Sequence, residues 1–115
     1  MPVTIYHNPK CSKSRQTLEL LEQQGITPTV IEYLKTPPDA ATLKEILARL
    51  KLTPRELMRK KETAYDECGI DNPALSEDDL IALMTQHPIL IERPIVLANG
   101  KAALGRPPEQ VLEIL

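Results

Sequence analysis

The sequence of 115 residues has no tryptophan, no phenylalanine, two cysteines and four glycines. It has no apolar run near the roughly 18 residues that a membrane-spanning helix needs, so we expect neither a transmembrane segment nor a membrane partner. Neither sign of charge dominates, with 14 Lys and Arg against 16 Asp and Glu. This balance excludes a globally basic nucleic-acid binder. The first residues contain no basic stretch followed by an apolar one, so no secretory signal peptide is expected.

The two cysteines point to a compartment and the prolines to a folded chain. Cysteines in a chain without a signal peptide indicate the reducing cytoplasm, where thiols react rather than form structural disulfides. Eleven prolines with only four glycines are too few for a low-complexity, disordered chain. The length suits one domain, and no repeat or linker interrupts it. We therefore expect a single domain over residues 1–115.

The first third of the chain has the pattern of a strand–helix–strand unit. The β-branched and aromatic segment Val3–His7 predicts a strand, and a helical pattern opens at Ser12 or Lys13 and ends at Gly25. A second strand is predicted over Thr29–Leu34. Strands joined through one helix lie parallel in the sheet, which predicts a βαβ unit.

The middle of the chain is helical. Apolar residues recur at helical spacing after Asp39, and Thr53–Glu56 has the pattern of a capping box with proline at the first helical position. Another helix is predicted to open at Ser76. Residues of about 36–90 are therefore expected to form a helical insertion between two halves of a sheet.

Strands return near the end of the chain. Pro94–Ala98 and Lys101–Leu104 flank Asn99-Gly100, the strongest short signal for a hairpin. A final helix is expected to begin after Gly105, and its predicted core face consists of Val111, Leu112 and Leu115. The order predicts an α/β fold with a mixed sheet of about four strands, flanked by helices.

Cys11 lies where the first strand leads into the first helix. The unpaired N–H groups and partial positive charge of a helix N-terminus favour a thiolate or a bound anion. Lys10, Lys13 and Arg15 add positive charge nearby. A free cysteine is more often a small buried apolar residue, but this polar, cationic turn favours a reactive thiol.

The spacing after Cys11 describes a monothiol. Residues 11–14 read C-x-x-S, so the turn holds no dithiol pair, and a mixed disulfide at Cys11 needs another thiol to resolve it. Cys68 lies among acidic residues, and we expect a buried residue at a helix end there rather than a resolving thiol. Ser12 and Ser14 are candidates to cap the helix or to bind the thiolate.

Three arginines and two histidines are further candidates. Arg59 is expected at the end of an insertion helix, Arg93 stands before Pro94, and Arg106 lies in the turn before the last helix. The planar guanidinium suits a tetrahedral oxyanion, although sequence spacing alone does not bring these residues together. His7 either tunes the thiolate or binds a loop, and His87 is expected to end a helix.

Five segments together resemble the glutaredoxin-coupled arsenate reductases, a family with a thioredoxin-like fold and a helical insertion. The segment from Ile5 to Arg15 resembles the active-site loop of that family. The other matching segments are Tyr33–Pro38, Leu57–Lys60, His87–Val96 and Gly105–Pro107. The resemblance covers essentially the whole chain in order. It implies a thioredoxin/glutaredoxin-like fold, consistent with the predicted elements.

The resemblance also implies roles for individual residues. Cys11 matches the nucleophile that attacks arsenate, and His7 matches a histidine that influences it. The three residues that match oxyanion-binding arginines are Arg59, Arg93 and Arg106. Pro94 matches the cis-proline beside the active-site turn. The residues of the loop that we expect to bind substrate are Asn8, Ser12, Ser14 and Arg15.

The function implied is reduction of arsenate to arsenite in the cytoplasm. Glutathione is the expected co-substrate and glutaredoxin the protein partner, because a monothiol enzyme takes its electrons from outside. No bound cofactor or metal is expected, and the helical stripes predict a monomer. Two alternatives are a redox-sensing regulatory or binding protein, and a glutathione-dependent thiol oxidoreductase with another substrate, both on the same fold.

Overall fold

The computed structural model describes residues 2–115, and the chain divides into two compact units. One unit combines residues up to 36 with residues 93–115, and the other is formed by residues 37–92. The first contains a four-stranded sheet and the second is helical. The second unit corresponds in sequence to the helical insertion expected over about residues 36–90.

The sheet of the first unit is mixed. Its elements are β1 (Val3–His7), α1 (Ser12–Gln23), β2 (Thr29–Glu32), β3 (Ile95–Ala98), β4 (Lys101–Leu104) and the 3-10 helix η3 (Pro108–Ile114). The strand order is β2-β1-β3-β4. β1 and β2 are parallel, whereas β1 pairs with β3, and β3 with β4, in antiparallel fashion. A mixed sheet of four strands with flanking helices confirms the predicted fold class.

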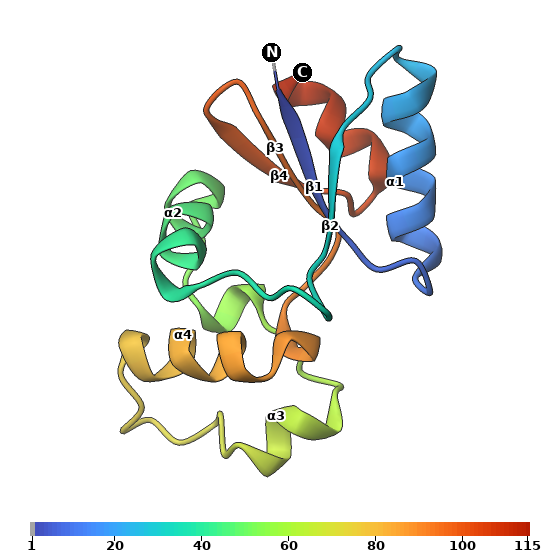
Figure 1. Ribbon diagram of the computed structural model, residues 1–115. Coiled ribbons are helices and arrows are strands. Elements are labelled where there is room, and N and C mark those ends of the chain that lie inside the picture. The colour runs from blue at the N-terminus through green and yellow to red at the C-terminus, as the bar shows by residue number, and fades with distance from the viewer. Residues whose placement is uncertain (1) are drawn as a thin grey trace. The chain divides into compact units, whose positions relative to one another are not determined.

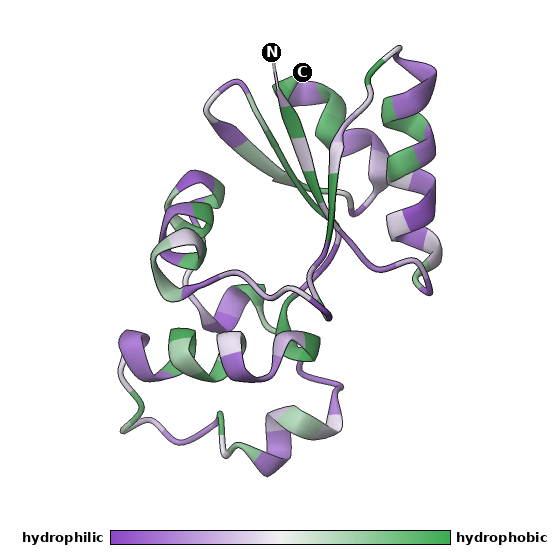
Figure 2. Cartoon of the chain, in the orientation of Figure 1, coloured by the Kyte–Doolittle hydropathy of each residue, from purple (hydrophilic) through white to green (hydrophobic). Residues whose placement is uncertain are grey.

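One face of the sheet packs against α1 and η3. These two helices lie side by side, α1 in blue and η3 in red in Figure 1. The buried residues between them and the sheet form the core cluster: Val3, Ile5, Leu21, Val96, Ala98, Val111 and Ile114. Figure 2 shows hydrophobic residues along β1 and β3 and hydrophilic ones on the outward side of α1. The period of hydrophobic residues thus determines which side of each element is buried.

β2 is shorter than predicted. It ends at Glu32 rather than at Leu34, because the Glu32 carbonyl accepts hydrogen bonds from the N–H groups of Lys35 and Thr36, both at 2.9 Å. These bonds close a turn in place of further pairing with β1. Tyr33 is buried in that turn, and Leu34 is exposed.

The last helix corrects the predicted core face. It is a 3-10 helix, which has three residues per turn, so Pro108, Val111 and Ile114 fall on one side and are buried. Leu112 and Leu115, which the α-helical spacing assigned to the core, are each 38% exposed. The prediction for these two leucines was wrong because it assumed 3.6 residues per turn.

The hairpin at the end of the sheet has the predicted turn. Ala98 pairs with Lys101, and the two residues between them, Asn99 and Gly100, have φ values of 54° and 73°. A two-residue turn with φ positive at both positions is the type that matches the twist of a hairpin, and asparagine followed by glycine adopts it readily. Asn99 also donates from Nδ2 to the Ile114 carbonyl at 2.8 Å, which joins the turn to η3.

The second unit contains three α-helices and two 3-10 turns. They are α2 (Ala40–Leu50), η1 (Arg55–Leu57), α3 (Thr63–Glu67), α4 (Glu77–Gln86) and η2 (Pro88–Leu90). Its fully buried large side chains are Leu43, Ile46, Leu57, Ile70, Met84, Leu90 and Ile91. Across residues 2–115, no helix is long and apolar enough to cross a membrane.

Capping residues define the helices of this unit. Asp39 accepts from the Thr42 N–H at 2.8 Å at the start of α2, and Ser76 and Asp79 form a reciprocal capping box on α4. The predicted capping box of Thr53 and Glu56 is present, but it opens only the short turn η1. Local signals therefore placed the helix starts. They did not predict α3 or η2, which are five and three residues long.

We expect Leu21→Ala to lower the free energy of unfolding by about 2–5 kcal/mol, because Leu21 is fully buried in the core cluster and alanine would leave a cavity. Urea titration followed by circular dichroism measures this loss. Leu112→Ala is the matched control and should change the free energy by less than about 1 kcal/mol, since Leu112 is partly in solvent. Equal losses for both variants would contradict the assignment of the core.

Candidate active site

Cys11 is the N-cap residue of α1. Its backbone is extended, with φ −96° and ψ 124°, and its N–H donates to the Asn8 carbonyl at 3.0 Å. No side chain caps this end, and the first turn, all of which is described, contains no acidic residue. The Cys11 side chain is therefore held at the N-terminus of a twelve-residue helix, where unpaired N–H groups favour a thiolate or an anion.

Arg106 approaches Cys11 from the other end of the chain. Its Nη2 lies 3.9 Å from Cys11 Sγ, although 95 positions separate the two residues. The Arg106 Nε donates to the Arg93 carbonyl at 2.8 Å, and this bond orients the guanidinium. A fixed positive charge beside a sulfur at a helix N-terminus makes this end of the sheet a site for a thiolate and for an oxyanion.

A buried hydroxyl connects the end of β1 to the first turn of α1. Ser14 Oγ lies 2.6 Å from His7 Nδ1 and accepts from the Asn8 N–H at 3.0 Å. A hydroxyl has one proton and two acceptor lone pairs, so Ser14 Oγ accepts from Asn8 and, according to the tautomer of the ring, donates to or accepts from His7 Nδ1. Ser14 is fully buried, so it supports the loop from beneath.

The environment of His7 favours the neutral ring. Burial lowers the pKa of His7 below its ordinary value; Glu32 opposes this lowering, and Arg15 adds to it. His7 itself is 6% exposed. The neutral ring has one donor and one acceptor nitrogen, and its hydrogen bond to Ser14 Oγ forms in either tautomer.

The loop that precedes Cys11 is fixed by its own polar groups. Asn8 Oδ1 accepts from the Lys10 N–H at 3.0 Å, and Arg15 Nη1 donates to the Pro9 carbonyl at 2.8 Å. Ser12 is exposed at the first position of α1. In the structure Asn8 and Arg15 thus shape the loop, while their expected contact with substrate stays a prediction.

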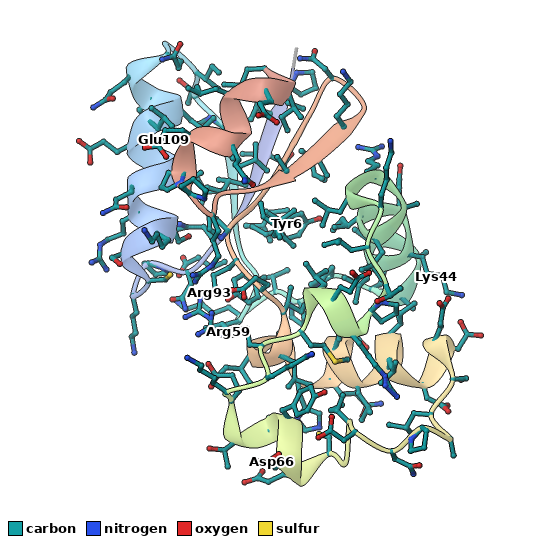
Figure 3. The ribbon with its side chains drawn as sticks, turned by 180° about the vertical axis from the view of Figure 1, so that it is seen from behind. Tyr6, Lys44, Arg59, Asp66, Arg93 and Glu109 are labelled. Atoms are coloured by element: carbon teal, nitrogen blue, oxygen red, sulfur yellow. The ribbon has the colours of Figure 1, made fainter. Side chains whose placement is uncertain are left out.

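The segment that leads into β3 completes this part of the site. The peptide bond between Arg93 and Pro94 is cis, as is the bond between Arg106 and Pro107. The Pro94 carbonyl accepts from the Gly105 N–H at 2.9 Å, so the strands remain paired next to Arg106. Figure 3 shows Arg93 at the end of the sheet where α1 begins.

Arg59 belongs to the second unit and pairs with carboxylates there. Its Nε lies 3.0 Å from Glu62 and its Nη1 2.9 Å from Glu92. The residue follows η1 by two positions rather than ending a helix, and its N–H donates to the Leu90 carbonyl at 2.7 Å. Glu62 is three residues from Arg59, whereas Glu92 lies 33 positions away and could not be identified as a partner from the sequence.

The two cysteines are far apart in the chain and both are free thiols. Cys68 is the C-cap of α3 in the second unit, which confirms its predicted place at a helix end, but it is only partly buried rather than buried as expected. Among residues 2–115, no group of three or more His, Cys, Asp or Glu side chains is arranged to hold a metal ion.

The sequence pointed to Ser14 as a residue that caps the helix, binds the thiolate or binds substrate, but it did not indicate that Ser14 and Thr17 anchor α1 beneath the site. Ser14 and Thr17 are polar but lie on the buried side of the helix, each with no exposed surface. Buried polar groups need hydrogen-bond partners, and Ser14 finds His7 and Asn8, while Thr17 Oγ1 donates to the Lys13 carbonyl at 2.8 Å. Hydroxyl residues on an otherwise apolar helix face were the available signal.

Comparison with known proteins places the chain among a defined set of relatives. Residues 6–114 match the ArsC family. Uncharacterized protein YfgD of Escherichia coli K12 is 58% identical, over 98% of this chain and 96% of that protein. An arsenate reductase of Neisseria meningitidis serogroup A is 53% identical, over 98% of this chain and 97% of its own length. The solved structure of an arsenate reductase from Vibrio cholerae superposes with a TM-score of 0.97 at 59% identity and covers all of this chain and 98% of that one.

We expect the stability of the protein to fall as the pH drops below about 6.5, the ordinary pKa of histidine, because the unfolded chain binds a proton at His7 that the folded chain resists. Above that pH His7 is neutral in both states and contributes no pH dependence. Urea midpoints at neutral and mildly acidic pH measure the slope. His7→Asn should show a shallower decrease, and an unchanged slope would contradict the assignment.

Proposed function

This chain belongs to the ArsC family, and from that membership we propose that it reduces arsenate to arsenite with Cys11 as the nucleophile. The observation that carries the proposal is the Arg106 guanidinium, 3.9 Å from Cys11 Sγ at the N-terminus of α1. Both the helix N-terminus and the guanidinium place positive charge at the sulfur. The same positive charges attract a tetrahedral oxyanion to the sulfur.

The arginines bind the oxyanion in this proposal. The planar fork of a guanidinium donates two parallel N–H groups to two oxygens, which a lysine ammonium does not do. Arg106 is oriented by its bond to the Arg93 carbonyl, so the two arginines lie on adjoining segments of the same unit. Arg59 remains a prediction from the family resemblance, because it belongs to the second unit.

The reaction begins at arsenic. The Cys11 thiolate attacks arsenic(V), a sulfur–arsenic bond forms, and one arsenic–oxygen bond breaks with loss of water. Glutathione then displaces a second oxygen as water, so that arsenic carries both sulfurs. The arginines stabilise the negative charge on the remaining oxygens throughout these two steps. Arsenic is still in the +5 state at this point.

Reduction needs a further thiol. A glutaredoxin thiolate attacks the glutathione sulfur, and the electron pair of the glutathione sulfur–arsenic bond passes to arsenic, which becomes arsenic(III). The products are a mixed disulfide of glutaredoxin with glutathione and arsenic(III) on Cys11. Water then hydrolyses the last sulfur–arsenic bond, which releases arsenite and restores the thiol. The C-x-x-S sequence supports this route, since the turn offers no second thiol of its own.

The reductant also suggests where the protein works. Glutathione is held reduced in the cytoplasm, so the proposed chemistry agrees with a cytoplasmic enzyme. A related possibility is a glutathione-dependent oxidoreductase that acts on other substrates. It uses the same nucleophile and differs only in the substrate that reacts with the Cys11 sulfur. Comparing arsenate with a glutathionylated protein as substrate separates the two.

We expect the wild-type protein to support arsenate-dependent NADPH oxidation when glutathione, glutaredoxin and glutathione reductase are supplied, and Cys11→Ser to abolish it. Cys68→Ser is the matched control and should keep most of the activity, because that thiol has no step in the reaction. A wild-type rate no higher than that of Cys11→Ser would refute the function. Loss of activity in Cys68→Ser would instead indicate an internal disulfide relay.

We expect Arg106→Ala to lower kcat/KM for arsenate by about 10²-fold, since one charge-assisted donor is removed from the developing oxyanion. Arg106→Lys should recover little, because the ammonium cannot reproduce the fork. Arg49→Ala removes a surface arginine that pairs with Glu45 and is the control for a loss of charge alone. Steady-state kinetics decide, and values within twofold of wild type for Arg106→Ala would contradict its role.

A further inference from the structure

Three segments of the first unit meet at Gly105. This residue is buried, and its N–H donates to the Pro94 carbonyl at 2.9 Å, directly after the pairing of Ile95 with Leu104. On its other side lies Thr17, in the middle of α1. Helix α1, the residue before β3 and the residue after β4 are therefore in contact at this point.

The contact leaves no space for a side chain at position 105. A Cβ there would lie 2.6 Å from Pro94 Cγ and even closer to Thr17 Oγ1, both well inside van der Waals distance. The other three glycines, Gly25, Gly69 and Gly100, have positive φ and nothing within 4 Å of a Cβ. Those three are required by backbone conformation, whereas Gly105 is required by space.

The Thr17 side chain has little freedom to move away from a side chain at position 105. It has no exposed surface, and its hydroxyl donates to the Lys13 carbonyl at 2.8 Å, one turn back along α1. A β-branched side chain in a helix has few rotamers to choose from. A methyl group at position 105 must therefore displace a backbone segment rather than one side chain.

Each of the three segments carries a residue of the site. Cys11 caps the helix that contains Thr17, Arg93 precedes Pro94, and Arg106 follows Gly105. We propose that Gly105 and Thr17 are positioning residues whose contact sets the distance between the Arg106 guanidinium and Cys11 Sγ. The effect of this contact on catalysis rests on the proposed function. The distance between Arg106 and Cys11, however, is a property of the protein without substrate.

The test uses a Cys68→Ser background, so that Cys11 is the only thiol that reacts. The second-order rate of alkylation by iodoacetamide is measured from about pH 5 to about pH 9, together with the arsenate concentration that protects half of Cys11. Gly105→Ala should shift the alkylation profile to higher pH and raise the protecting concentration about tenfold or more, since a displacement of about 1 Å suffices for such losses. Thr17→Ala, which loosens the same contact, should shift both in the same direction by less.

Gly100→Ala is the matched control, because it strains a positive-φ turn away from the contact and should lower the urea midpoint without moving either readout. Wild-type values for a folded Gly105→Ala overturn the proposal. If Gly105→Ala does not fold, Thr17→Ala decides, and wild-type values there also overturn it. The alkylation profile needs no turnover, so a wild-type protein that fails to reduce arsenate would refute the proposed function without affecting this result.

Discussion

The Ser14 hydroxyl is the interaction on which the rest of the site depends. It joins His7, the last residue of β1, to the amide of Asn8 and to the first turn of α1. Removing one partner would leave a buried polar group unsatisfied, which costs about 1–3 kcal/mol. Cys11 lies between these anchored points, so this buried oxygen, together with the hydrogen bonds of the loop itself, holds the turn from strand to helix that positions the sulfur.

The positive charge of the site comes from few sources. Burial lowers the pKa of His7, so its contribution near neutral pH is geometric rather than electrostatic. The helix N-terminus and Arg106 supply the charge beside Cys11. Arg59 differs, because two carboxylates, Glu62 and Glu92, already neutralise its guanidinium within the second unit. Similar arginines in the sequence thus occupy different electrostatic surroundings.

Local signals predicted most of the elements. The β-branched segment at β1 and the Asn99-Gly100 turn were identified from the residues alone, since each depends on neighbours in sequence. The α-helical spacing failed at Leu112 and Leu115, because no local signal distinguishes a 3-10 helix from an α-helix.

The candidate site was less predictable than the fold. The composition of the turn around Cys11 indicated a reactive thiol. The proximity of Arg106 to Cys11, however, is a tertiary contact between residues 95 positions apart. Arg106 was assigned to the site from the family resemblance, and its spacing in the sequence did not indicate it. The pairing of Arg59 with Glu92 and the contact of Gly105 with Thr17 could not be predicted for the same reason, since both join residues far apart in the sequence.

The separation of the sheet into two stretches of chain has a consequence for folding kinetics. β1 must pair with β3 across the whole of residues 37–92, and such non-local contacts slow folding. The equilibrium penalty is small, because each doubling of a loop adds only about 0.6 kcal/mol. The β3–β4 hairpin and the helices of the second unit involve nearby residues and can form early. We therefore expect the central β1–β3 pairing, and with it the Cys11–Arg106 contact, to be among the last features to assemble.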